Sequence, residues 1–464
     1  MNFNDILVAV DDFVWGIPLM VLILVGGLLL TCRTKLIQIF HLPLALKWMV
    51  QEEEGGQGDV SSFGALCTAL SATIGTGNIV GVATAICAGG PGALFWMLVA
   101  AFLGMATKYA EGFLAVKYRV TTPDGRKLGG PFYYIEKGMG KNWKWLGKLF
   151  AIFGALAGLL GIGTFTQING ITGAVNNFFD PQNVNTISLF GAEYSWSVVI
   201  AGLIVTACTI AVLIGGVKRI SSVSEFVVPF MALLYIVTVG IILVTNASAI
   251  PAAFVEIVES AFGLRAAAGG ALGAIMVAMQ KGIARGIFSN EAGLGSAPIA
   301  AASVKTNEPV AQGLVSMTGT VIDTLIICTL TGLSIVITGS WNVGLEGVAV
   351  TTRAFQLGLP FSDSVAAFIL MICLVFFAFT TILGWDYYGE KCVEYLVGDK
   401  PSILKGYRWL YILAVFIGPY MTVSAVWTIA DIFNGLMAFP NLIALVALSG
   451  VVVAETRNYF ERHK

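Results

Sequence analysis

Apolar stretches about as long as a bilayer is thick recur along the whole chain, and they constrain its fold more than any other feature. A helix needs about 20 mainly apolar residues to cross a membrane. Of the 464 residues, 57% are hydrophobic and 11% are charged, whereas a soluble protein has roughly 25% charged residues. This pattern excludes a soluble multi-domain enzyme. It predicts an all-α integral membrane protein whose single domain, residues 1–464, crosses the bilayer many times.

The apolar runs predict about eleven transmembrane helices. They cover residues 14–32, 63–88, 93–116, 145–175, 196–215, 226–245, 266–302, 311–338, 362–388, 407–429 and 436–456. Residues 37–50 and 253–262 are shorter and weakly amphipathic, so each is expected to lie along the membrane surface or to form a loop.

Basic residues predict the orientation. Lys and Arg cluster after the odd-numbered runs and at the end of the chain, while residues 176–195 contain neither. Because basic loops stay in the cytoplasm, we expect an N-terminus outside the cell and a cytoplasmic C-terminus, in the plasma membrane (the inner membrane of a Gram-negative cell). An odd number of crossings agrees with this orientation.

Glycine-rich interruptions in the second and seventh runs indicate a binding site. The second run contains Gly75, Gly77 and Gly81, and the seventh is expected to break within residues 276–282. Irregular backbone inside a membrane is tolerated where it lines a cavity or binds a ligand, although glycines also serve close helix packing. The two runs lie five apart, which predicts an inverted repeat of five plus five helices (residues 63–246 and 263–456) after one extra helix (14–32).

The chemistry of a broken helix indicates the ligands. Free amides at the start of the resumed helix suit a carboxylate, and here they belong to Thr76, Gly77 and Asn78. Free carbonyls at the end of the preceding half, from Ser71 to Ile74, suit a small cation. A carboxylate together with a monovalent cation describes ion-coupled uptake of an amino acid.

Four motifs resemble those of the alanine/glycine:cation symporters, the sodium:alanine symporter family. They are GTGNI at 75–79, GGPGALFWM at 89–97, GGP at 129–131 and FSNEAGLGS at 288–296. The resemblance extends over essentially the whole chain. It implies a leucine-transporter-like fold and import of alanine or glycine by alternating access, coupled to sodium or sometimes to protons. Leu98 stands where the family pattern has a second Trp, which we expect to be harmless.

The resemblance also implies particular contacts. The amides of Thr76 and Gly77 would hold the substrate carboxylate. In the wider fold, carbonyls of the first core helix and two adjacent hydroxyls on the eighth coordinate sodium. The residues implied as sodium ligands are Ser71, Ile74, Thr380 and Thr381. Paired threonines in a membrane helix also commonly bond back to their own backbone.

Further substrate contacts are expected around these positions. Gln167 lies deep in the fourth run, where an amide should face the bundle interior, either towards the substrate or as a strut between helices. Ile275 and Met279, at the expected break of the seventh run, would form an apolar wall near the substrate methyl group. Trp385 would close the pocket from the other side, although side chains of these types are also ordinary packing residues.

Ionisable residues inside the runs are functional candidates. Lys108 and Glu111 are three residues apart and are expected to form a local salt bridge or a contact on the cytoplasmic side. Asp323 has no local partner, so it would take part in cation coupling or pair with a base from another helix. Asn290 and Glu291 are expected to order the cytoplasmic side of the seventh run.

Several function classes are disfavoured. The histidines are His41 and His463, the cysteines are scattered singly, and the formal net charge is −1. We therefore expect no enzymatic activity, no cofactor beyond a co-transported sodium ion, no nucleic-acid partner, and function as a monomer in the lipid bilayer. Proton-coupled uptake remains an alternative, and a passive channel is a weaker one because no repeated pore helix is visible.

Overall fold

The structure is a computed structural model that describes residues 3–51, 56, 58–189, 191–264 and 270–462. Within these residues nine helical stretches are long and apolar enough to cross a membrane, and one bent pair makes ten. In chain order they are α1–α2 (Phe3–Val14, Ile17–Arg33), the bent pair α5 (Ser62–Thr73) with η1 (Gly77–Gly81) and α6 (Val82–Gly89), α7 (Gly92–Lys117), α9–α10 (Lys144–Leu160, Phe165–Phe179), α11 (Trp196–Leu213), α12 (Gly216–Thr245), α14 (Ala271–Asn290), α16 (Pro309–Thr320) with η5 (Val321–Cys328) and α17 (Thr329–Thr338), α19 (Asp363–Val397) and α21 (Val423–Arg462).

Shorter elements connect these stretches. They are α3 (Ile37–Phe40), α4 (Leu42–Val50), α8 (Pro131–Tyr134), η2 (Ile135–Met139), η3 (Lys141–Trp143), η4 (Ala247–Ala249), α13 (Ile250–Ala261), α15 (Ala297–Ala301), η6 (Ser340–Asn342), α18 (Val348–Gly358), α20 (Pro401–Ile417) and η7 (Gly418–Tyr420). Strands β1 (Val120–Thr121) and β2 (Lys127–Leu128) form one antiparallel hairpin, and β3 (Thr186–Leu189) and β4 (Ala192–Ser195) form another, with Thr186 opposite Ser195.

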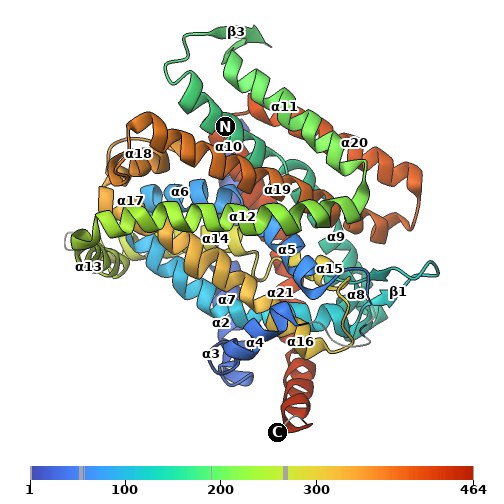
Figure 1. Ribbon diagram of the computed structural model, residues 1–464. Helices are drawn as coiled ribbons and strands as arrows, with labels where there is room; N and C mark the ends of the chain where they lie inside the picture. Colours follow the sequence, from blue (N-terminus) through green and yellow to red (C-terminus); the bar gives the residue numbers. More distant parts are fainter. Residues whose placement is uncertain (1–2, 52–55, 57, 190, 265–269, 463–464) are drawn as a thin grey trace.

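Most of the long helices run between two ends of the bundle. In Figure 1, α13 and α18 lie at the left end of the bundle, and α8 and the β1 hairpin lie at the right end. Arg126 of that hairpin pairs with Glu394 and Asp399 near the end of α19. We call this end the basic side, because the predicted cytoplasmic loops lie there, and we call the end with α13 and α18 the opposite side.

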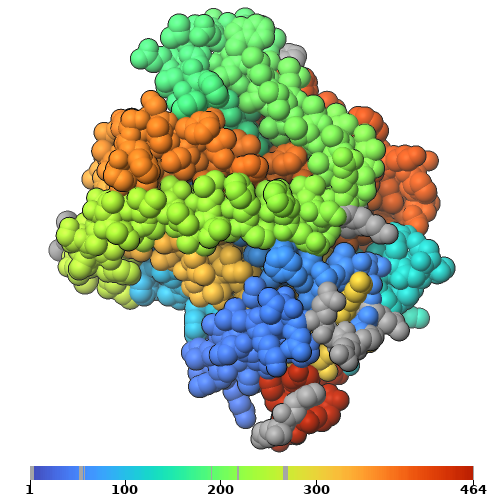
Figure 2. Space-filling view, viewed as in Figure 1, coloured from blue at the N-terminus to red at the C-terminus, as the bar shows by residue number. Residues whose placement is uncertain are grey.

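Helix α12 shows how the sequence suits a lipid environment. Its Phe226, Leu233 and Val244 are exposed, whereas Tyr235 and Val239 are buried. A helix that is apolar on both its inner and outer faces is suited to lipid on the outside. Figure 2 shows α12 as a continuous band across the front of the molecule, between the α18–α19 segment and the blue N-terminal helices.

Serine residues begin several of the spans. The hydroxyl oxygens of Ser61 and Ser362 accept hydrogen bonds from the third amide of α5 and α19, at 2.9 and 3.4 Å. Ser195 caps α11 through the amide of Ser197 at 3.3 Å. Such caps satisfy amides that have no partner within the helix.

The observed helices correct some predicted boundaries. The fourth run is broken at 161–164 instead of being continuous, and Tyr411 of α20 donates a hydrogen bond to the carbonyl of Gly163 there at 2.8 Å. The predicted tenth run, 407–429, is divided: α20 ends at Ile417, and Pro419 lies in the turn before α21, as expected for a residue that cannot continue a helix. At 17 residues, α20 is at the short limit for a crossing. A total of eleven crossings therefore stays a prediction.

The predicted break of the seventh run is wrong in position. Helix α14 continues through residues 276–282 and ends at Asn290, and the irregular segment is 291–296. A Cβ atom on Gly282 would meet the carbonyl oxygen of Ala93, and one on Gly286 would lie 3.0 Å from Met97. These glycines therefore permit close packing of α14 on α7. The predicted start at 266 lies outside the described residues.

Candidate functional site

The second span is interrupted where the sequence predicts. Helix α5 ends at Thr73 and the chain is helical again from Gly77. The amide of Gly75 donates to Oδ1 of Asn78 at 2.9 Å, and the amide of Thr76 donates to Oε1 of Gln167 at 3.0 Å. Side chains thus satisfy backbone groups that lipid could not satisfy, and the predicted residues Thr76, Gly77, Asn78 and Gln167 lie together.

A glycine is required at the centre of this break. A Cβ atom on Gly75 would lie 2.8 Å from Oε1 of Gln167 and closer still to the hydroxyl of Thr381. Helices α10 and α19 therefore both approach the backbone here. On the resumed helix, a Cβ atom on Gly77 would lie 3.1 Å from the ring of Phe288 and from Cα of Ser289, so α14 closes the third side.

The predicted sodium ligands are brought together in part. The hydroxyl of Thr381 lies 3.2 Å from the carbonyl oxygen of Ile74, which joins α19 to the last carbonyl before the break. The hydroxyl of Thr380 bonds to Phe376 and Phe377 of its own helix. Ser71 is fully buried, and its hydroxyl bonds to the carbonyl of Thr68.

The predicted apolar wall lies elsewhere. Ile275 and Met279 are half-buried in α14, away from any break. Met279 precedes Phe288 by nine residues, which is roughly 13 Å along a helix. Phe288 is the residue that faces Gly77, and its ring packs at a tilt of 39° against that of Trp427, with 4.8 Å between the ring centres. Sequence reasoning missed both aromatic residues, although Phe288 belongs to the FSNEAGLGS motif.

The irregular segment 291–296, between α14 and α15, is the second break. Trp385 faces this break instead of the first one at 74–77. Its indole nitrogen donates to Oε1 of Glu291 at 2.8 Å. Glu291 has a positive φ of 58°, and its other carboxylate oxygen accepts from Ser296 at 2.6 Å. A left-handed, fully buried glutamate is unusual, and these two bonds hold it in the turn between α14 and α15.

Glu111 organises the same turn. Its Oε1 accepts hydrogen bonds from the amides of Gly293 and Gly295, both at 3.1 Å, and from Asn441 at 2.7 Å. Across the residues that the structure describes, no ion pair within 4.0 Å joins it to Lys108, so the predicted local salt bridge is wrong. The partially positive amides of the turn lie nearer to the carboxylate than the ammonium group does.

Asp323 lies directly behind the first break. It is fully buried on the π-helical segment η5. Its carboxylate accepts from Asn78 at 2.6 Å, from Ser289 at 2.8 Å and from Thr324 at 2.6 Å. Among the described residues it forms no ion pair within 4.0 Å, so the predicted alternative of a salt bridge is wrong. Segments η1 and η5 are both π-helical and contact each other, and π-bulges are common at functional sites.

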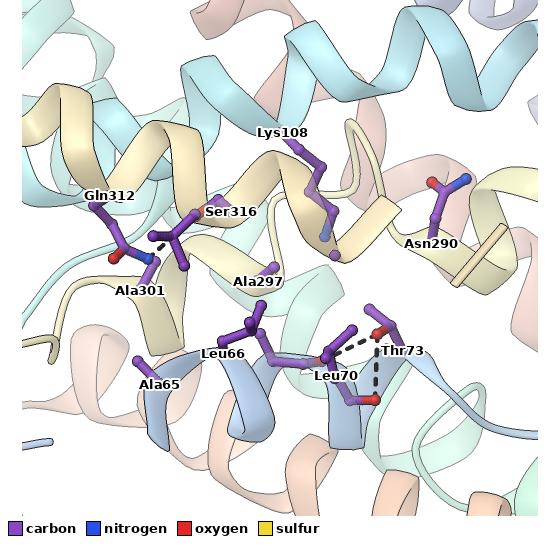
Figure 3. A pocket seen from close by; sticks show the side chains of 13 residues that line it. Ala65, Leu66, Leu70, Thr73, Lys108, Asn290, Ala297, Ala301, Gln312 and Ser316 are labelled. Atoms are coloured by element: carbon purple, nitrogen blue, oxygen red, sulfur yellow. Dashed lines mark hydrogen bonds between the residues drawn. The ribbon is translucent and has the colours of Figure 1, made fainter. Parts of the chain in front are cut away.

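A small pocket, lined mainly by apolar residues, lies beside the first break, between α5, α7, α15 and α16. Figure 3 shows Lys108 extending from α7 into this pocket, above Thr73 and Leu70 of α5, while Gln312 and Ser316 bond to each other at its far end. Lys108 is 3% exposed. Lys108 and Asn290 thus line the same pocket inside the bundle, where ionisable and polar side chains are uncommon and are functional candidates.

This architecture, a bundle of spans interrupted at buried polar sites, is that of an integral membrane transporter. The crystal structure of MhsT in complex with L-phenylalanine has a similar fold, with a TM-score of 0.57, 14% identity and coverage of 87% of this chain and 99% of that one. The likeness supports the leucine-transporter-like fold that the motifs imply.

The chain belongs to the sodium:alanine symporter family, which it matches over residues 1–464. It is 47% identical to the sodium/alanine symporter AgcS of Methanococcus maripaludis, covering 100% of this chain and 99% of that protein. It is 53% identical to an uncharacterised transporter of Haemophilus influenzae (100% and 98% covered) and 38% identical to the probable sodium/glutamine symporter GlnT of Bacillus subtilis (98% and 90% covered). The protein is thus an amino-acid symporter and not an enzyme.

The glycine at the break gives a direct test. Replacing Gly75 with Ala should abolish uptake while the protein still inserts, because the new methyl group displaces Gln167 and Thr381. Gly240 of α12 has open space around it, so Gly240→Ala is the matched control and should transport normally. Initial uptake rates, normalised to the amount of inserted protein, measure the effect. Normal transport by the Gly75 variant would contradict the geometry of the break.

Proposed function

We propose that the protein imports a small neutral amino acid, alanine or glycine, by sodium-coupled alternating access. The observation that carries this proposal is the break at 74–77, where backbone amides and a carbonyl meet the side chains of Gln167 and Thr381. Such a site would bind its ligands through backbone dipoles, hydroxyl groups and amide side chains.

The substrate carboxylate would bind the amides of Thr76 and Gly77. The amide of Thr76 is bonded to the neutral side-chain oxygen of Gln167. A carboxylate makes a stronger hydrogen bond to an amide than a neutral oxygen does, so the substrate would displace this oxygen. The freed side chain of Gln167 can then contact the substrate's polar groups, together with Asn78.

Restricted space supports a small substrate. Phe288 lies against Gly77, and Trp427 packs against Phe288. This aromatic pair would wall the site on the α14 side in place of Ile275 and Met279. A methyl group or a hydrogen atom fits such a wall better than a long side chain does. The name of the relative AgcS, a sodium/alanine symporter, favours alanine, whereas the name of the more distant GlnT favours glutamine.

Sodium would bind between α5 and α19. The carbonyl of Ile74 and the hydroxyl of Thr381 supply the first two oxygens. Ser71 lies about one helical turn before Ile74, and Thr380 is the residue before Thr381. The carbonyl of Ser71 and the hydroxyl of Thr380 would complete the set of ligands after a rotation of the Thr380 side chain. Oxygen ligands of this kind suit a hard monovalent cation. Coupling to protons is the alternative that Asp323 favours, because it is a buried carboxyl group near the break.

The proposal extends to placement in the cell. The basic side would face the cytoplasm and the opposite side the exterior, in the plasma membrane, with the transporter acting as a monomer. Transport would therefore begin at the side of α13 and α18.

Uptake of labelled alanine and glycine into liposomes containing the purified protein tests the proposal. Sodium and proton gradients are imposed separately. We expect accumulation above the external concentration with an inward sodium gradient and none with a proton gradient alone. Accumulation that follows the proton gradient would show that the coupling ion is the proton and not sodium. Entry of substrate only up to the external concentration would indicate a channel.

Thr381→Ala tests the sodium ligands. Loss of one oxygen ligand should raise the sodium concentration for half-maximal uptake by about tenfold, corresponding to roughly 1.4 kcal/mol. Thr209→Ala is the matched control, because Thr209 is a buried hydroxyl that bonds to Val205 of its own helix. An unchanged sodium dependence would remove Thr381 from the site.

Asp323→Asn tests the role of the buried carboxylate. The amide retains the shape and one acceptor oxygen but removes the charge that would attract a cation. We expect uptake to fall by about tenfold or more, with a raised sodium requirement if sodium is the coupling ion and a lost pH dependence if it is the proton. Asp363→Asn, at an exposed helix start, should behave as wild type. Full activity with unchanged ion dependence would assign Asp323 a purely structural role.

A further inference from the structure

Two adjoining cavities lie on the opposite side, above the first break. One has a volume of about 390 Å³ and the other about 190 Å³. Both are lined by Glu346, Gly347, Val423 and Trp427. The larger cavity also borders Arg285 and Cys87, so a cationic and an anionic side chain line the same space.

The smaller cavity reaches the elements that form the break. It is lined by Val80 of η1 and by Thr166 and Gly170 of α10. A Cβ atom on Gly170 would lie 2.5 Å from the methyl group of Thr76. Only one layer of side chains therefore separates the cavities from the break at 74–77.

Arg285 presents its guanidinium group at the wall of the larger cavity. It forms an ion pair with Asp431 through Nη1, and its carbon Cζ lies 4.6 Å from the ring centre of Trp427. The side chain is 12% exposed. A guanidinium has five N–H donors, and within the described part of the chain the bond to Asp431 is the one side-chain hydrogen bond that it makes. Further donors are thus left for a ligand.

Glu346 supplies the complementary charge. It is exposed at the mouth of both cavities, just before α18. In the described part of the chain its carboxylate has no hydrogen bond or ion pair. A carboxylate held beside a low-dielectric cavity attracts cationic groups.

We infer that these cavities form an outer reception site for a zwitterionic α-amino acid. Arg285 binds the α-carboxylate and Glu346 binds the α-ammonium group. The site captures the substrate before it reaches the break. This inference rests on the proposed amino-acid transport. It adds a second binding site along the transport path, and there side chains bind both charged groups of the substrate.

The aromatic residues connect the two sites. The guanidinium of Arg285 stacks on Trp427, the ring of Trp427 contacts that of Phe288 at 4.8 Å, and Phe288 lies against Gly77. A carboxylate that draws Arg285 away from Asp431 also weakens its stacking on Trp427. The ring is then free to move aside, which opens the way to the break.

Glu346→Gln tests the site by uptake kinetics. We expect KM for alanine to rise about fivefold at nearly unchanged kcat, because capture is weakened while the later steps are intact. Glu346→Asp should restore most of the affinity. Glu193→Gln is the matched control, since Glu193 is exposed on β4 and lines neither cavity. A KM within about twofold of wild type for Glu346→Gln would overturn the inference.

Cys87 provides a readout that does not depend on transport. It lines the larger cavity, and its modification by a small thiol reagent can be followed by mass spectrometry in the full-length protein. Saturating alanine should slow this modification in wild type and not in Glu346→Gln. Protection that persists in the variant would place alanine only at the break and overturn the inference. If the wild-type protein neither accumulates nor binds any small neutral amino acid, the proposed function itself is wrong. That result differs from both loss and persistence of Cys87 protection in the Glu346→Gln variant.

Discussion

The backbone groups between Thr73 and Gly77 are the constraint on which the rest of the structure depends. Within a bilayer there is no water to satisfy them, so other helices must bring partners to them. Gln167 of α10 and Thr381 of α19 supply two of these partners, and Asn78 of the resumed helix supplies a third. The bundle must therefore hold α10 and α19 against the break, and the absence of a side chain at Gly75 allows that approach.

The same constraint is met differently at the second break, and the difference supports the proposed substrate site at the first. The amides of Gly293 and Gly295 bond to the resident carboxylate of Glu111, whereas the amide of Thr76 bonds to the neutral side chain of Gln167. An incoming carboxylate gains by displacing a neutral acceptor and gains little by displacing a charged one. The first break is thus suited to exchange partners during transport, and the second is suited to remain fixed.

Sequence reasoning predicted the parts of this arrangement that depend on polarity and depth. Hydropathy located the spans, the polar glycine motif located the first break, and the depth of Gln167 placed it in the bundle interior. The pairing of Thr381 with Ile74 came from family resemblance. Phe288 and Trp427 were missed, because aromatic residues are common in every membrane span and no periodic signal separates a binding wall from ordinary packing. Two of the partners of Asp323, Asn78 and Ser289, were missed for a related reason, since they come from segments that are distant in the sequence.

The error over the seventh run shows what a glycine in a membrane helix means. Gly282 and Gly286 are helical and let α7 approach, so they lie within continuous α14. Gly293 and Gly295 have positive φ values of 88° and 81°, conformations that few other residues adopt, and they lie among Asn290, Glu291 and Ser296. A broken backbone exposes donors and acceptors that need polar partners nearby. Gly282 and Gly286 thus serve packing, because the neighbouring helix leaves no room for a Cβ atom, whereas Gly293 and Gly295 mark a break, because they have positive φ values and lie among buried polar side chains.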